Sequence, residues 1–171
     1  MFLLERGLKQ IHETVSALLV EARQESHDLT PEDIEDVRLL VQSDAQKKGL
    51  QLVWDNQLDR PLSLPSTPVR QVLMNLSLNA VQAAEQAGQV TLSVARVDGL
   101  LEIRVSNDGV TVSNEEIGRL FEPFVHDRPG GTGLGLWITY QIVQQFGGEI
   151  FVHSEHGTTC FMVHLPLELA A

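Results

Sequence analysis

The stretch VTLSVARVDGLLEIRVS, residues 90–106, decides the fold of this 171-residue chain. Apolar and polar residues alternate over Val90–Val97 and again over Leu101–Ser106, which is the pattern of two half-buried strands. Asp98-Gly99 between them is a dipeptide typical of a tight hairpin turn. The sequence therefore predicts two neighbouring antiparallel strands.

Further strands and helices are expected on both sides of this hairpin. Thr30 as a cap, Pro31 at the first helical position and acidic residues in the first turn indicate a helix that ends at Gly49. The other helices are expected at 67–87 with Gly88 just past the end, at 114–121 with Asn114 as the cap, and at 134–146. Short strands are expected at 51–54, 150–153 and 159–165, and a loop at 61–68.

This order of elements predicts an α+β fold, a two-layer α/β sandwich. Its sheet is expected to be mixed and largely antiparallel, and helices should cover one face. A parallel Rossmann sheet fits less well because the strands come in hairpins.

The first part of the chain is expected to form an amphipathic helix over residues 3–25, because apolar residues recur there at helical spacing. The apolar face of this helix needs a partner. An interchain bundle is a natural use for it, and packing on its own domain is the alternative. We therefore divide the chain into residues 1–27 and a main domain of residues 28–171.

Composition excludes some classes of function. A formal net charge of -11 with scattered Lys and Arg argues against nucleic-acid binding. The single cysteine, Cys160, has no partner for a disulfide or a zinc cluster, and no apolar stretch is long enough to span a membrane. We expect a cytoplasmic piece in which any anionic ligand is held by local devices such as backbone N–H groups or a divalent cation.

Two motifs supply such devices. In QVLMNLSLNA, residues 71–80, Asn75 and Asn79 share one helical face, and Gln82 follows one turn further along. In GGTGLG, residues 130–135, glycines permit close approach of a phosphate just before a helix N-terminus. This loop is neither a Walker loop nor a dinucleotide fingerprint, because the residues that follow and precede it are wrong for both.

With NDG at 107–109 and LFEPF at 120–124, these motifs resemble the N, glycine and F boxes of the ATPases shared by gyrase, the Hsp90 chaperones, histidine kinases and the MutL proteins. The resemblance covers residues 67–166 and implies Mg·ATP binding, with Asn79 as the Mg²⁺ ligand. It assigns ATP binding to Asn75, Asn79, Gln82, Asn107, Gly109, Val112, Phe124, Arg128, Gly131, Thr132, Gly133, Leu134, Gly135, Leu136 and Thr159.

Asn75 discriminates between the enzymes of this superfamily. Members that hydrolyse ATP with a protein base have a glutamate where this chain has Asn75, and an amide has no useful basicity. The chain therefore resembles the catalytic domain of a sensor histidine kinase, in which an external imidazole is the nucleophile. This resemblance implies a response regulator as the final recipient and a homodimer through the hairpin helices.

The first glycine box departs from the family pattern of Asp, any residue, Gly, any residue, Gly. Alternation along the preceding strand places Asn107, not Asp108, at the position of the aspartate that binds the adenine amino group. Thr111 stands where the second glycine is usual, and we expect it to stiffen or tilt the loop. Between the F box and the second glycine box only residues 125–129 remain; there Arg128 is a candidate phosphate contact and His126 a solvated loop residue.

The phosphoaccepting histidine is expected to lie outside this sequence. His12-Glu13 superficially resembles an acceptor pair, but only one amphipathic run precedes the catalytic part, and an acceptor helix needs a hairpin partner. We interpret residues 1–27 as the second hairpin helix and His12 as a surface residue. Two alternatives stay open: a degenerate nucleotide-binding or scaffolding module, and a serine kinase of the anti-sigma type.

Overall fold

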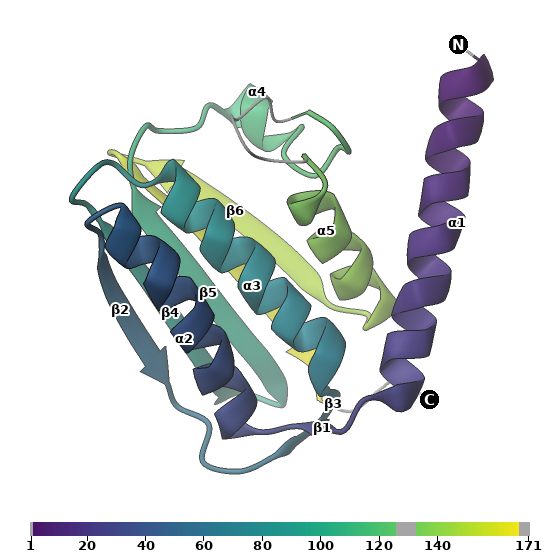
Figure 1. Cartoon of the computed structure of the whole chain (residues 1–171), viewed down its shortest axis with the longest axis horizontal. Helices are drawn as coiled ribbons and strands as arrows, with labels where there is room; N and C mark the ends of the chain where they lie inside the picture. Colours follow the sequence, from purple (N-terminus) through teal and green to yellow (C-terminus); the bar gives the residue numbers. More distant parts are fainter. Residues whose placement is uncertain (1, 126–132, 168–171) are drawn as a thin grey trace.

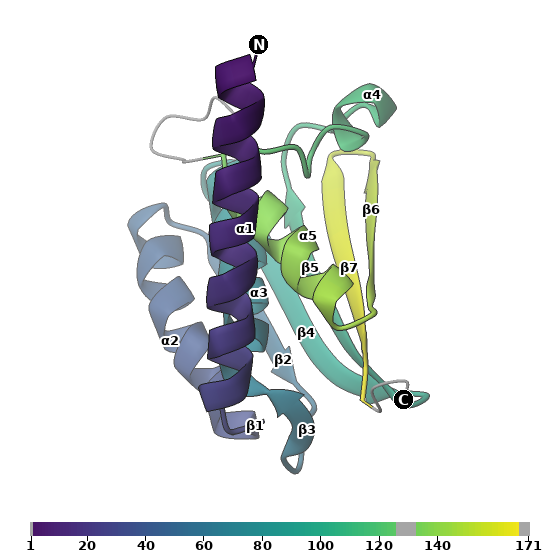
Figure 2. The same cartoon turned by 90° about the vertical axis from the view of Figure 1, so that its right-hand side faces the viewer.

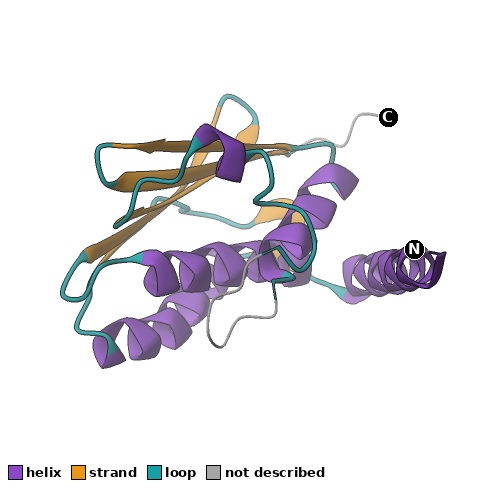
Figure 3. Ribbon diagram, turned by 90° about the horizontal axis from the view of Figure 1, so that it is seen from above, coloured by secondary structure: helices purple, strands orange, loops and turns teal. Residues whose placement is uncertain are grey.

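The computed structural model describes residues 2–125 and 133–167. A five-stranded sheet in the order β2-β4-β5-β7-β6 forms one layer, and α2, α3 and α5 cover one of its faces (Figures 1 and 3). The elements in chain order are α1 Phe2–Glu25, β1 Asp28–Leu29, α2 Pro31–Lys47, β2 Gln51–Asn56, β3 Leu62–Pro65, α3 Ser66–Ala83, β4 Gln89–Val97, β5 Leu100–Asp108, α4 Asn114–Ile117, α5 Gly135–Gln145, β6 Glu149–Glu155 and β7 Thr158–Pro166. The predicted α+β two-layer sandwich is confirmed.

The central hairpin forms as predicted. β4 and β5 pair antiparallel around the turn at Asp98 and Gly99, where both residues have positive φ. β7 pairs antiparallel with β5 and with β6, whereas β2 pairs parallel with β4, so the sheet is mixed and largely antiparallel. Alternate residues of β4, β5 and β7 are buried beneath the helices, for example Leu92, Ile103 and Val163. These side chains form the core between the two layers.

One expectation near residues 61–68 was wrong. Instead of a loop, Leu62–Pro65 forms β3, which pairs with the two-residue strand β1, and Leu62 and Leu64 are buried on the same side of it. The backbone N–H of Ser66 then donates to the carbonyl of His27, and α3 begins at Ser66. The pairing partner of β3 is remote in sequence and too short to show a periodic pattern.

The ends of two helices also differ from expectation. α3 ends at Ala83, and Gly88 does not cap it. A Cβ on Gly88 would collide with a carboxylate oxygen of Asp108, so this glycine makes room for that side chain. α4 is capped by Ser113 rather than Asn114, because Ser113 and Glu116 form a reciprocal capping box.

The expected N-terminal helix is present as α1, which runs beside α3 and α5 (Figure 2). Its outer positions carry exposed apolar side chains, namely Leu3, Leu4, Leu8, Ile11 and Leu18. His12 is exposed, and its ring centroid lies 6.0 Å from that of Trp137 on α5. In residues 2–125 and 133–167, no helix is both long and apolar enough to cross a membrane.

Candidate functional site

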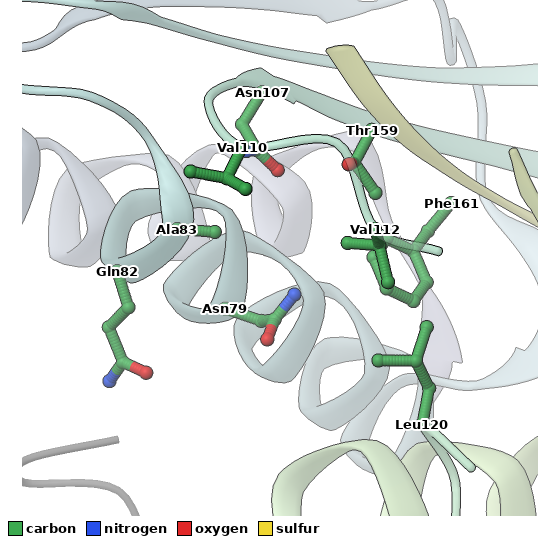
Figure 4. A pocket seen from close by; sticks show the side chains of 9 residues that line it. All are labelled: Asn79, Gln82, Ala83, Asn107, Val110, Val112, Leu120, Thr159 and Phe161. Carbon is green, nitrogen blue, oxygen red and sulfur yellow. The ribbon is translucent and has the colours of Figure 1, made fainter. Parts of the chain in front are cut away.

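A pocket of about 250 Å³ opens between the C-terminal half of α3 and the ends of β5 and β7 (Figure 4). Among the described residues, none of the lining side chains is ionisable, so this part of the wall is neutral. The lining residues are Asn79, Gln82, Ala83, Asn107, Val110, Val112, Leu120, Thr159 and Phe161. The pocket therefore suits a flat, uncharged group recognised by hydrogen bonds and apolar contact rather than by charge.

Asn107 provides the pocket with a buried acceptor. Its side chain is 4% exposed, and its Nδ2 donates to the backbone carbonyl of Asp108 at 2.9 Å. This bond fixes the orientation of the amide, because the flipped amide would set two acceptor oxygens against each other. Oδ1 is turned into the pocket (Figure 4) and has no hydrogen-bond partner among the described residues.

The predicted register of this box is confirmed. Asp108 lies on the other side of the strand, where its Oδ2 accepts from the backbone N–H of Gln89 at 2.9 Å. A buried acceptor without a partner is costly, and Oδ1 of Asn107 faces an open pocket, so a donor that enters the pocket can satisfy it. The exocyclic amino group of adenine is such a donor, and the residues present fit that group.

The loop after β5 is fastened to the β6–β7 turn. The N–H of Gly109 donates to the carbonyl of Gly157, and the N–H of Gly157 donates to Oγ1 of Thr111, each at 2.9 Å. The threonine that replaces the usual glycine therefore stiffens the loop through its hydroxyl. Gly109 has φ of 149°, and a Cβ there would lie 2.6 Å from the carbonyl oxygen of Ala83, so only glycine fits this close approach.

A pair of hydroxyls completes this wall. The backbone N–H of Val112 donates to Oγ of Ser154 at 2.8 Å, and Ser154 Oγ lies 2.8 Å from Oγ1 of the buried Thr159. Sequence reasoning found Val112 and Thr159 but missed Ser154. Ser154 sits at an inward position of an alternating strand, which is the signal that was available.

The N-box residues divide into two groups. Asn79 and Gln82 line the pocket; in Figure 4 Asn79 extends from α3 into the space below Asn107, whereas Gln82 points away from it. Asn75 lies outside the lining. Its Nδ2 donates to the carbonyl of Gly135 at 3.0 Å and to Oγ1 of Thr139 at 3.3 Å, so it joins α3 to the first turn of α5.

Gly133, the first described residue of the second glycine box, contacts the F box. The N–H of Phe124 donates to the carbonyl of Gly133 at 3.0 Å, and a Cβ on Gly133 would lie 2.9 Å from Cα of Phe124. Both residues have positive φ, and the Phe124 side chain is 52% exposed. The close approach explains why residue 133 is glycine.

The other residues predicted for this part of the site lie in different places. Leu134 immediately precedes α5, which begins at Gly135 rather than Leu134. Leu136 is buried in the core and does not line the pocket. His126, Arg128, Gly131 and Thr132 lie outside the described residues.

The sequence and the fold agree on a family. A family model described as histidine kinase-, DNA gyrase B-, and HSP90-like ATPase matches residues 65–169. The chain belongs to this family. The match begins one residue before α3 and runs through β7, so it contains every residue that lines the pocket.

Curated relatives of the chain are named as kinases. Sporulation kinase D of Bacillus subtilis is 26% identical over 90% of this chain, and sensor histidine kinase ZraS of Escherichia coli is 33% identical over 76% of it. These alignments cover 31% and 28% of the two relatives. The chain thus spans about a third of their length or less.

Solved structures share the fold. The catalytic domain of histidine kinase ThkA, in a nucleotide-free form, matches with a TM-score of 0.73 at 25% identity, covering 83% of this chain and 97% of that one. Full-length ShkA in complex with AMPPNP matches with a TM-score of 0.74 at 25% identity. That match covers 98% of this chain, α1 included, and 39% of ShkA.

Proposed function

We propose that this chain is the ATP-binding catalytic portion of a sensor histidine kinase, which transfers the γ-phosphate of ATP to a histidine outside residues 1–171. The observation that carries the proposal is the buried Oδ1 of Asn107, which has no hydrogen-bond partner among the described residues. It lies in a pocket whose described lining is neutral, inside the matched ATPase region. The adenine amino group would donate to this oxygen, and the apolar side chains of Val110, Val112 and Phe161 would pack on the base.

The same proposal places the phosphates on the other side of Asn79. Mg²⁺ prefers hard oxygen ligands and keeps several waters, so one amide oxygen from Asn79 is a sufficient protein contribution. When bound, the ion would neutralise phosphate charge, which a chain of net charge -11 otherwise repels. From the sequence we retain Gln82, Phe124, Arg128 and residues 131–135 as further ATP contacts, whereas Leu136 belongs to the core.

The hydrogen bonds of the Asn75 side chain favour a kinase over a hydrolase. Its amide nitrogen is committed to Gly135 and Thr139, and its Oδ1 accepts from Nε2 of Gln71 at 2.8 Å. An amide cannot take a proton from water, and this one is already satisfied on both sides. Activation of the nucleophile therefore falls to a group outside the pocket, which an acceptor imidazole provides.

The division of the chain follows from α1. We propose that residues 1–27 form the second helix of a dimerisation hairpin and that residues 28–171 form the catalytic domain. Support comes from the exposed leucines of α1, which a hairpin partner and a second copy would cover. A response regulator receiver domain would then take the phosphoryl group from the acceptor histidine.

The test has a binding arm and a transfer arm. Calorimetric titration with Mg·ATP should show binding, and no binding would favour a degenerate scaffolding module. Radiolabelled ATP should leave the isolated chain unlabelled, yet label a supplied acceptor hairpin from a related kinase in an acid-labile form. Acid-stable label on serine would favour the anti-sigma type, and label on the chain that is lost in His12→Ala would overturn our interpretation of α1.

A further inference from the structure

The C-terminal end of α3 is held by the lysine that follows α2. Lys48 follows directly after α2, and its Nζ donates to the carbonyl oxygens of Val81 at 2.9 Å, Gln82 at 2.9 Å and Ala84 at 2.5 Å. An ammonium group has three protons. Each proton of Lys48 therefore has its own backbone acceptor at the end of α3.

This arrangement replaces an ordinary helix cap. The last four carbonyls of a helix have no donor within it, and a glycine in left-handed conformation often solves the problem. Here Ala84 is extended, with φ of -61° and ψ of 144°, and its N–H reaches only the carbonyl of Ala80. Lys48 donates to the carbonyls of Val81 and Gln82. Its positive charge also interacts favourably with the negative end of the helix dipole.

The turn that Lys48 holds is a wall of the pocket. Gln82 and Ala83 both line the pocket; the carbonyl of Gln82 accepts from Lys48, and Ala83 lies between two residues whose carbonyls do so. The carbonyl oxygen of Ala83 is packed against Gly109, two residues after Asn107. The position of this turn therefore sets the distance between α3 and the strand end that carries the buried acceptor.

We infer that Lys48 is a positioning residue for nucleotide binding: its ammonium fixes the last turn of α3 and, through Ala83 and Gly109, the width of the base-binding part of the pocket. This inference rests on the proposed function. It predicts that removal of the ammonium weakens binding of the base, whereas dependence on Mg²⁺ is retained because Asn79 lies a full turn earlier in α3.

The experiment compares Lys48→Met with Lys47→Met. Lys47 is the adjacent residue, with a side chain 73% exposed and a single ion pair to Asp44 at 3.4 Å, so it controls for loss of one positive charge. Calorimetric titrations with adenosine and with Mg·ATP are made at a temperature where circular dichroism shows each variant to be folded. Lys48→Met should weaken both ligands about tenfold, the scale for one charge-assisted hydrogen bond, and Lys47→Met should leave both unchanged.

Graded variants keep the test decisive if Lys48→Met does not fold. Lys48→Arg keeps a charged donor, and its affinity for adenosine should be within about threefold of that of the wild type. Lys48→Gln has a neutral donor, and its affinity should lie between those of Lys48→Arg and Lys48→Met. A purely structural role would lower the melting temperature but leave adenosine affinity unchanged, and that result would overturn the inference. Failure of the wild type to bind ATP would instead contradict the proposed function.

Discussion

The side-chain amide of Asn75 on α3 donates to the backbone carbonyl of Gly135, the first residue of α5, across 3.0 Å. Four residues further along α3, the side chain of Asn79 lines the pocket and makes no hydrogen bond to the described residues. The two asparagines share a helix face, yet one joins two helices and the other is available to a ligand. This difference predicts opposite consequences for the same substitution.

Asn75→Ala should cost about 2 kcal/mol of stability, because it removes the two hydrogen bonds to α5 and the one from Gln71, and leaves a gap between α3 and α5. Urea denaturation monitored by circular dichroism measures the loss. Thr139→Val is the companion variant: it removes one of the two acceptors and should cost less than Asn75→Ala. Equal stability of Asn75→Ala and the wild type would show that this contact does not hold the helices together.

Asn79→Ala should impair metal-dependent ligand binding rather than stability. Its loss should change stability by less than about 1 kcal/mol, since no hydrogen bond to the described residues is broken. If Asn79 ligates Mg²⁺, titrations with ATP should lose their dependence on Mg²⁺ in this variant and keep it in Asn75→Ala. A large loss of stability with metal-dependent binding intact would assign Asn79 a structural role instead.

Asp33 gives the fold a predictable pH dependence. Burial alone would raise the pKa of Asp33, but hydrogen bonds from the backbone and hydroxyl of Thr30 and from His27 outweigh it, so the pKa lies below the ordinary value of 3.8. A lowered folded-state pKa stabilises the fold above the unfolded-state pKa, and this stability is lost as pH falls through the folded-state pKa. The contribution should therefore be complete at pH 7 and disappear below about pH 4.

The comparison that isolates this effect is Asp33→Asn against Asp36→Asn, an exposed carboxylate on the same helix. At pH 7 Asp33→Asn should be less stable than the wild type by about 1 kcal/mol, the scale for a weakened helix cap. In urea titrations at pH 3, the difference in the free energy of unfolding between Asp33→Asn and the wild type should be smaller. Asp36→Asn should have the same free energy of unfolding as the wild type at both pH values. A difference that is constant with pH would mean that packing, not charge, determines the effect.

Local patterns predicted the main sheet and the side of the strand on which Asn107 lies. Alternation along residues 101–106 was enough to place Asn107 in the pocket and Asp108 outside it, because a strand has a period of two. The capping sequence at Thr30 and Pro31 likewise predicted the start of α2, where the side-chain and backbone bonds are all local. Such features depend on neighbours within a few residues.

Features set by remote contacts were not predictable in this way. α3 ends four residues earlier than the sequence suggested, since Lys48 satisfies its last carbonyls and the expected glycine, Gly88, is used to accommodate Asp108. β3 forms because it finds β1, and Ser154 joins the site only through the register of β6 and β7. Tertiary partners therefore decided each of these outcomes.

Asn107 offers a neutral oxygen where an aspartate would offer a charged one, and a charge-assisted hydrogen bond is roughly twice as strong as a neutral one. Asn107→Asp should therefore tighten ATP binding by about fivefold, equivalent to about 1 kcal/mol. The gain is limited by the bond from Nδ2 to the carbonyl of Asp108, which the carboxylate cannot make and would oppose.

Calorimetric titration of both proteins with ATP and GTP measures the effect, since guanine has no amino group at the corresponding position. Asn107→Ala is the control. It removes the acceptor and should weaken the binding of ATP more than the binding of GTP. Asp108→Asn, outside the pocket, should leave the ratio of ATP to GTP affinity unchanged because its carboxylate contacts Gln89. If Asn107→Asp improved GTP as much as ATP, the buried oxygen would not read the base, and the orientation proposed for the nucleotide would be wrong.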